Sequence, residues 1–228
     1  MGDRDTKEPP TTVEKYARIS TPTPVILMLG DSITELGADP NLLGYQVLLT
    51  HAYQRKADVV NRGMSARTTR WWVAQLPRVV ADWEHKHPSL ISIFLGVNDA
   101  SVPGNTPLHV PLNEFEANVH SLLNGFSAAF PACAFVLVTP SAVDERSPWG
   151  TLWKNDRAAT YAASVLALGI ARRVPVVDLY TPTEANLNLF FDGLHLGKEG
   201  NVLLHQLWLN AVRSHLPHLA PENLKWAF

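Results

Sequence analysis

Five short apolar runs, separated by longer segments with helical periodicity, constrain most strongly what this chain can fold into. The runs occupy residues 25–29, 58–60, 90–95, 135–138 and 174–179. Apolar runs of this length, bounded by turn residues, are typical of strands buried on both faces of a sheet. Strands that alternate with helices form a parallel sheet covered by helices on both sides. The sequence therefore predicts an α/β fold, a three-layer α/β/α sandwich with a five-stranded parallel sheet.

The segments between the runs carry apolar side chains at the spacing of amphipathic helices. Helices are predicted over residues 42–56, 68–86, 111–129, 153–173 and 200–216. Pro77 is expected to kink or break the second helix, because proline removes a backbone hydrogen bond and clashes with the preceding turn. The irregular loop of residues 100–110, which contains two prolines and a glycine, is expected to overhang a ligand site.

The pattern predicts one domain over residues 24–218, with no internal repeat and no second boundary. Residues 1–23 mix threonine, proline and charge without the apolar segment of a secretory signal, and are expected to form a flexible leader. The C-terminal tail, residues 219–228, ends in an unusually aromatic segment, LKWAF. Two interpretations stay open for it: contact with a partner subunit in a homodimer, or docking on its own domain.

The composition argues against several function classes. The net charge is −2, which offers no electrostatic surface for nucleic acid. No apolar run approaches the roughly 20 residues that span a membrane, so we expect a cytoplasmic protein without membrane insertion. Cys133 has no partner for an internal disulfide and lies in an apolar run, as a buried structural thiol does. His85 and His87 have no third ligand in the pattern, and no metal or other cofactor is predicted.

Polar residues follow three of the predicted strands, at the edge where a parallel sheet binds its ligands. They lie in residues 30–35 (GDSITE), 61–65 (NRGMS) and 96–99 (GVND), and a fourth polar segment, residues 192–195 (DGLH), lies near the C-terminus. Because the carboxyl ends of parallel strands share one edge, the first three segments are predicted to converge.

This set contains the groups that cleavage of an ester requires: a nucleophile, a base and a group that orients the base. Ser32 follows a strand and opens a helix, where its hydroxyl can project from the sheet, and is the predicted nucleophile. Asp192 and His195 are three residues apart, so one turn can bring the carboxylate to the imidazole. His195 is the predicted base and Asp192 its partner.

Donors for the developing oxyanion are also present. The predicted donors are the backbone N–H groups of Ser32 and Gly63 and the side-chain amide of Asn98. Asp31 and Asp99 are predicted to support the nucleophile turn and the Asn98 loop. Each residue also has an ordinary structural explanation, as a helix cap, a surface ion pair or a turn residue. Their coincidence at several strand ends favours catalysis.

Together, the four segments resemble the signature blocks of the SGNH (GDSL-type) hydrolases, and most closely those of the isoamyl acetate-hydrolysing esterase branch. The similarity is carried by residues 30–37 (GDSITELG), 61–71 (NRGMSARTTRW), 93–100 (IFLGVNDA) and 192–201 (DGLHLGKEGN), with 109–112 (HVPL) and 139–145 (TPSAVDE). The resemblance implies the strand order 2-1-3-4-5. It also implies a serine esterase that needs no cofactor and acts on small-molecule esters of short-chain, acetate-type acids.

Other functions stay open at this point. Within the same family, the chain could be a carbohydrate deacetylase or a lysophospholipase. From a different class, it could be a non-catalytic binding module that kept the fold. The sequence contains no Gly-x-Ser-x-Gly motif, which disfavours the α/β-hydrolase family.

Overall fold

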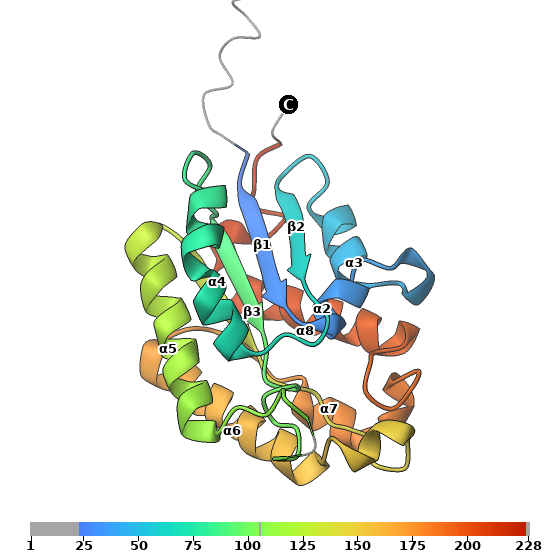
Figure 1. The fold of residues 1–228 in the computed structure, drawn as a ribbon. Helices are drawn as coiled ribbons and strands as arrows, with labels where there is room; N and C mark the ends of the chain where they lie inside the picture. The colour runs from blue at the N-terminus through green and yellow to red at the C-terminus, as the bar shows by residue number, and fades with distance from the viewer. Residues whose placement is uncertain (1–22, 105, 227–228) are drawn as a thin grey trace, which may run out of the picture.

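The computed structural model describes residues 23–104 and 106–226, which are built around one parallel sheet (Figure 1). Its strands run in the order β2-β1-β3-β4-β5, which confirms the predicted fold and order. The strands are β1 (Val25–Gly30), β2 (Asp58–Gly63), β3 (Leu90–Phe94), β4 (Ala134–Val138) and β5 (Val176–Val177). The second strand is longer than its apolar run, because polar residues 61–63 continue the pairing with β1. The fifth is only two residues long.

Helices cover both faces of the sheet (Figure 1). They are α2 (Ser32–Leu36), α3 (Tyr45–Ala52), α4 (Thr69–Asp82), α5 (Leu112–Ala129), α6 (Asn155–Arg172), α7 (Tyr180–Ala185) and α8 (Lys198–His215). Short 3-10 turns occupy η1 (Pro40–Leu42), η2 (Pro148–Thr151), η3 (Leu187–Leu189) and η4 (Pro217–Leu219). All five predicted helices are present, although their ends differ from the predicted ones.

Successive side chains of β1 point to opposite faces of the sheet, and they therefore belong to two separate layers of the core. Ile26 and Met28 join the cluster that includes residues of α3 and α8. Leu27 and Leu29 join the cluster formed with α4, α5 and α6. Both faces of the strand are therefore buried, as the uninterrupted apolar run predicts.

Pro77 does not break α4, which continues from Thr69 to Asp82. The predicted break is wrong for a reason that lies in tertiary packing. Pro77 is on an exposed position of the helix, while Trp72 and Val79 are buried in the core. Leu76 packs so close to α5 that a methyl group added at Gly125 would meet its side chain at 2.3 Å. Burial of these side chains outweighs the one backbone hydrogen bond that proline removes.

The described part of the C-terminal tail lies against its own domain. Leu219 is buried, and its carbonyl accepts a hydrogen bond from the Tyr53 hydroxyl (2.9 Å). Glu222 pairs with Arg213 of α8 (2.9 Å), and Leu224 packs against the core. Residues 219–226 thus contact their own domain, and the homodimer contact stays a prediction. Residues 227–228, and the leader except for residue 23, lie outside the described residues.

Two further predictions concern exposure. Cys133 is partly rather than fully buried, and this burial raises the pKa of its thiol to about 12, so the thiol stays protonated near neutral pH.

None of the helices in the described ranges is both long and apolar enough to cross a bilayer.

Candidate active site

The nucleophile turn begins where β1 ends. Asp31 caps α2, since its Oδ1 atom accepts the N–H of Ile33 (3.0 Å), and Ser32 is the first residue of the helix. Gly30 leaves no room for a side chain, because an added Cβ would lie 1.9 Å from Thr34 Oγ1 and 2.8 Å from the Phe94 carbonyl oxygen. Packing on both sides therefore fixes the backbone that presents Ser32.

The structure brings the three predicted catalytic side chains together. The Nε2 atom of His195 lies 3.0 Å from Ser32 Oγ, and its Nδ1 atom lies 2.7 Å from Asp192 Oδ2. The imidazole thus touches the hydroxyl with one nitrogen and the carboxylate with the other. This geometry lets the ring accept the serine proton while the carboxylate stabilises the resulting imidazolium.

Asp192 also organises its own turn. Its Oδ1 atom accepts the backbone N–H groups of Leu194 (2.9 Å) and His195 (2.8 Å). Burial works to raise the pKa of Asp192, but the hydrogen bonds from His195 and Leu194 outweigh it and hold the pKa below its ordinary value. The carboxylate is therefore charged at neutral pH, as its contact with the imidazole requires.

A second contact closes this turn at its base. The backbone N–H of Phe191 donates to the carbonyl of His195 (3.0 Å), and Phe190 forms an antiparallel bridge with Leu196. Gly193 has a φ of +91°, a region that disfavours residues with a side chain. The segment from residue 190 to residue 196 is therefore a closed loop that carries both Asp192 and His195.

Two aromatic side chains that the sequence analysis did not identify flank the imidazole. Trp149 meets the His195 ring edge-on at 5.9 Å, and its indole N–H donates to Asp192 Oδ2 (3.1 Å). Phe191 stacks against the other side of the ring at 5.9 Å and 22°, although 54% of its surface is exposed. No local motif marks Trp149, because the contact joins segments 43 residues apart in the chain.

Asn98, the predicted amide donor, lies in the loop after β3, whose last residue, Phe94, is paired with Gly30 at the end of β1. It is 4% exposed, and one hydrogen of its amide is donated to the carbonyl of Arg67 (3.0 Å). An amide carries two such hydrogens, so the second is left for a ligand. The contact fixes the orientation of the amide against the loop that follows β2.

The backbone N–H of Gly63 makes a different contact from the predicted one. Its N–H donates to Asn61 Oδ1 (2.7 Å), so in this structure it is not free for a substrate oxygen. The prediction of Gly63 as a donor conflicts with this bond. The glycine is needed for packing instead, since an added Cβ would lie 2.1 Å from the backbone nitrogen of Glu35.

The backbone N–H of Ala66, in the loop after β2, differs from those of the two residues before it. The N–H groups of Met64 and Ser65 are taken by the Gly30 carbonyl (3.1 Å) and by Glu35 Oε2 (2.5 Å). Within the described ranges, the N–H of Ala66 has no protein acceptor. Ala66 also has a φ of +58°, which is unusual for a residue with a side chain. The sequence contains no sign of this conformation, because alanine does not favour it.

Two buried carboxyl groups lie behind the nucleophile. Asp99 accepts the backbone N–H of Thr69 (3.0 Å) and also its hydroxyl, which links the Asn98 loop to the start of α4. The Oδ2 atom of Asp31 is buried and has no hydrogen-bond partner among the described residues. Burial raises the pKa of each carboxyl to about 7, and the proximity of Asp99 adds to the increase for Asp31. Asp31 thus contacts the start of α2 and Asp99 the start of α4.

The loop of residues 100–110 is tied to the neighbouring α6. Arg157 donates through Nε to the carbonyl of Ala100 (2.7 Å), and its Nη2 atom lies 3.2 Å from His109 Nδ1. The loop starts directly after Asp99, so these contacts anchor a segment that borders the Asn98 loop. Its predicted overhang above the ligand stays a prediction.

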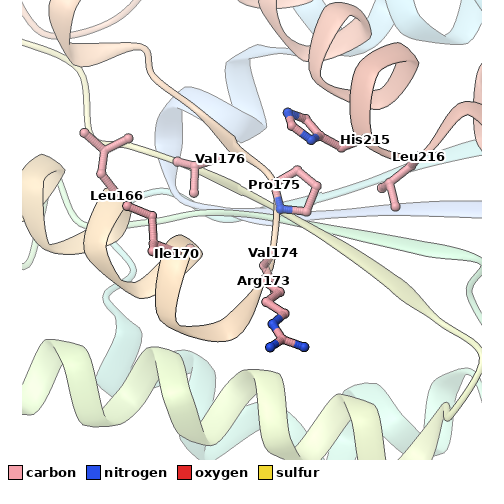
Figure 2. Close-up of a pocket in the computed structure, with 9 residues that line it drawn as sticks. Leu166, Ile170, Arg173, Val174, Pro175, Val176, His215 and Leu216 are labelled. Carbon is pink, nitrogen blue, oxygen red and sulfur yellow. The ribbon is translucent and has the colours of Figure 1, made fainter.

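Two cavities of about 490 Å³ each lie away from the triad side chains. One surrounds the start of β5, between Leu166 and Ile170 of α6 and His215 of α8 (Figure 2). The other adjoins the end of β2 and is lined by Met64 and Trp71, among others. No triad residue lines either of them, so it is the geometry of the side chains that locates the site. Within the described residues, no group of three His, Cys, Asp or Glu side chains is placed to hold a metal ion.

Comparisons with known proteins agree with this geometry. A model of the GDSL-like Lipase/Acylhydrolase family matches residues 28–203. The isoamyl acetate-hydrolyzing esterase 1 homolog of Rattus norvegicus is 32% identical, over 87% of this chain and 86% of the relative. The isoamyl acetate-hydrolyzing esterase of Saccharomyces cerevisiae is 30% identical, over 88% of this chain and 90% of the relative.

Solved structures show the same fold. A lipase/acylhydrolase from Enterococcus faecalis is 24% identical with a TM-score of 0.69, covering 89% of this chain and 98% of the other. Axe2, an acetylxylan esterase from Geobacillus stearothermophilus, is 25% identical with a TM-score of 0.65, covering 83% of this chain and 94% of the other. The chain belongs to the GDSL-like lipase/acylhydrolase family and is a carboxylic ester hydrolase.

Proposed function

We propose that this protein hydrolyses short-chain, acetate-type esters of small alcohols, with Ser32 as nucleophile, His195 as general base and Asp192 as the residue that orients the base. The observation that carries the proposal is the unbroken path from Ser32 Oγ through the imidazole to the Asp192 carboxylate, with steps of 3.0 and 2.7 Å. The acetate preference is supported by the names of the relatives, which include isoamyl acetate-hydrolyzing esterases and an acetylxylan esterase.

The reaction has two steps. Ser32 Oγ attacks the ester carbonyl while its proton moves to His195 Nε2, and the negative charge forms on the carbonyl oxygen. The bond to the alkoxy group then breaks, and the alcohol leaves with the proton from His195. Water attacks the acyl-enzyme in the same manner, giving its proton to His195. The acid departs, and the proton returns to Ser32.

The oxyanion donors in this proposal are the Ser32 N–H, the free amide hydrogen of Asn98 and the N–H of Ala66. Ala66 replaces Gly63 because the Gly63 N–H is already bonded to Asn61. Donors that are fixed before the reaction stabilise the transition state without reorganisation, and loss of one typically costs ~3–4 kcal/mol. The bond from Asn98 to the loop after β2 supplies such fixation.

A carbohydrate deacetylase is the second candidate, favoured by the similarity to the acetylxylan esterase. The exposed Phe191 ring beside His195 is the kind of surface on which a sugar ring packs. Both candidates use the same triad and the same acyl group, and they differ in the alcohol that is released.

The test compares alcohols and acyl chains in one series. Isoamyl acetate and p-nitrophenyl esters from acetate to octanoate are measured beside an acetylated xylo-oligosaccharide, using wild type and Ser32→Ala. The proposal expects the highest kcat/KM for the acetates of small alcohols, a serine-directed phosphonate attached to Ser32, and loss of turnover in Ser32→Ala. Highest activity on the oligosaccharide favours the deacetylase. Absence of both turnover and labelling in the wild type would indicate a binding module. The matched control is Ser121→Ala, on the exposed face of α5.

A further inference from the structure

Arg67 lies in the loop between β2 and α4, at the border of the proposed oxyanion hole. Its backbone carbonyl accepts the Asn98 amide hydrogen (3.0 Å), and the residue before it is Ala66. The backbone of Arg67 is therefore in direct contact with one proposed donor and bonded to another. Its side chain starts at the edge of the site.

The Arg67 side chain rests on an aromatic platform connected to the nucleophile turn. Its guanidinium carbon lies 5.1 Å from the centre of the Trp71 ring, a cation–π contact. Trp71 meets Trp72 edge-on at 5.1 Å, and the indole N–H of Trp72 donates to the carbonyl of Gly30 (3.1 Å). The chain of contacts from Arg67 thus ends at Gly30, two residues before Ser32.

One donor of the Arg67 guanidinium, the N–H at Nε, has no acceptor among the described residues. The Nε atom of Arg67 is buried without a hydrogen-bond partner, and no ion pair involves this residue anywhere in ranges 23–104 and 106–226. Some arginines, by contrast, have a carboxylate partner: Arg70 lies 2.6 Å from a Glu114 oxygen, and Arg213 lies 2.9 Å from a Glu222 oxygen. A buried N–H without an acceptor is costly, and a guanidinium that is held in place fits a carboxylate through two parallel bonds.

We propose that Arg67 is a specificity-determining residue that binds a carboxylate carried by the substrate, so that the preferred esters have a free acid group. This inference rests on the proposed function, because it concerns the substrate of the same site. The carboxylate can belong to the acyl part, as in a half-ester of a dicarboxylic acid, or to the alcohol part, as in an acetylated hydroxy acid. The recognising chemistry is the same in both cases, and the experiment separates them.

The experiment uses two pairs of esters matched in size. Monomethyl glutarate is compared with methyl hexanoate for the acyl side, and 3-acetoxypropanoate with butyl acetate for the alcohol side. Hydrolysis is followed by titration of the released acid, which gives kcat/KM for each ester. The wild type should prefer the anionic member of at least one pair.

Three variants test whether Arg67 causes this preference. In Arg67→Gln, kcat/KM for the preferred anionic ester should fall about tenfold to a hundredfold, the usual effect of losing a charge-assisted hydrogen bond. Turnover of the neutral esters should be unchanged, which also shows that the variant is folded. Arg67→Lys keeps the positive charge but lacks the planar, paired N–H donors of a guanidinium, so it should retain part of the preference for the anionic ester. Arg70→Gln is the matched control, because Arg70 is exposed and paired with Glu114.

Two results overturn the inference while leaving the proposed function intact. In one, the wild type hydrolyses neutral esters and prefers neither anionic ester. In the other, Arg67→Gln reduces turnover of charged and neutral esters equally, which would give Arg67 a structural role only. A wild type that cleaves neither kind of ester would instead contradict the proposed function itself.

Discussion

Trp149 donates its indole N–H to Asp192 Oδ2, the same carboxylate oxygen that His195 contacts through Nδ1. One oxygen therefore has two donors, at 3.1 and 2.7 Å, while the other accepts two backbone N–H groups. The carboxylate that orients the base has no freedom to rotate without losing several hydrogen bonds. Trp149 is thus a positioning residue that acts through Asp192.

Replacing Trp149 with phenylalanine removes this hydrogen bond and keeps most of the aromatic packing. We expect kcat/KM to fall about tenfold, which corresponds to a charge-assisted hydrogen bond of ~1.5 kcal/mol. The loss should increase at acid pH, because the carboxylate is then easier to protonate. The pH dependence of kcat/KM tests this. Trp226→Phe is the matched control, since Trp226 is 65% exposed. If kcat/KM fell by the same factor at every pH, the substitution would have disturbed the structure of the site in general rather than the Asp192 carboxylate.

Asn98→Ala removes the proposed amide donor. Because the donor acts on charge that forms in the transition state, kcat should fall by roughly 10²–10³ while KM changes little. Steady-state kinetics on a short-chain ester measure both values. The control is Asn188→Ala, at an exposed position of η3. If KM increased and kcat were retained, Asn98 would be a residue that binds the ground state instead.

Gly30→Ala tests the packing around the nucleophile turn. Its Cβ would lie within 3 Å of both Thr34 and the Phe94 backbone, so we expect a destabilisation of about 1–3 kcal/mol from overpacking. Gly104→Ala is the comparison: Gly104 has a φ of +80° but no atom within 4 Å of the added methyl group. It should lose only the ~1 kcal/mol of an unfavourable backbone conformation. Urea unfolding measures both. A loss at Gly30 no larger than the loss at Gly104 would mean that the neighbouring atoms move aside and that overpacking does not limit position 30.

Asp31→Asn should change how stability depends on pH. The pKa of Asp31 is raised from 3.8 to about 7 in the folded protein, so between these values the folded state holds a proton that the unfolded state has lost. This group's contribution to stability is full below pH 3.8 and is lost as pH rises to about 7, by at most ~1.4 kcal/mol per pH unit.

Asparagine can still cap α2, but it does not titrate. The variant should therefore become more stable relative to the wild type as pH rises from 5 to 7. Urea unfolding of both proteins at each pH gives the difference, in which the titration of His205 and of other groups that do not interact with Asp31 cancels. Parallel stability curves for the two proteins would contradict the assignment.

Much of the fold could be predicted because its determinants are local. An uninterrupted apolar run such as that of β1 identifies a strand buried on both faces, and the turn after it identifies Ser32. Asp192 and His195 are recognisable because they share one turn. The end of β2 could not be predicted from hydropathy, because Asn61 and Arg62 pair with β1 through their backbones.

The remaining site residues depend on contacts between distant segments. Trp149 and Arg67 acquire their positions only when separate elements meet. The difference between the predicted and the observed contact of the Gly63 N–H has a related cause. A glycine in a sequence indicates a close approach of the backbone, but it does not say whether the N–H faces a substrate or, as here, the side chain of Asn61.

The closed loop of residues 190–196 divides the catalytic apparatus into two rigid parts. The base and its carboxylate belong to one part, while the nucleophile and the proposed oxyanion donors belong to the other, at the edge of the sheet. Displacement of the loop as a unit leaves the imidazole–carboxylate distance unchanged, but it alters the gap between Ser32 Oγ and His195 Nε2 and the hydrogen bond from Trp149 to Asp192. If heating unfolds this loop first, ester hydrolysis would therefore stop while the sheet is still folded.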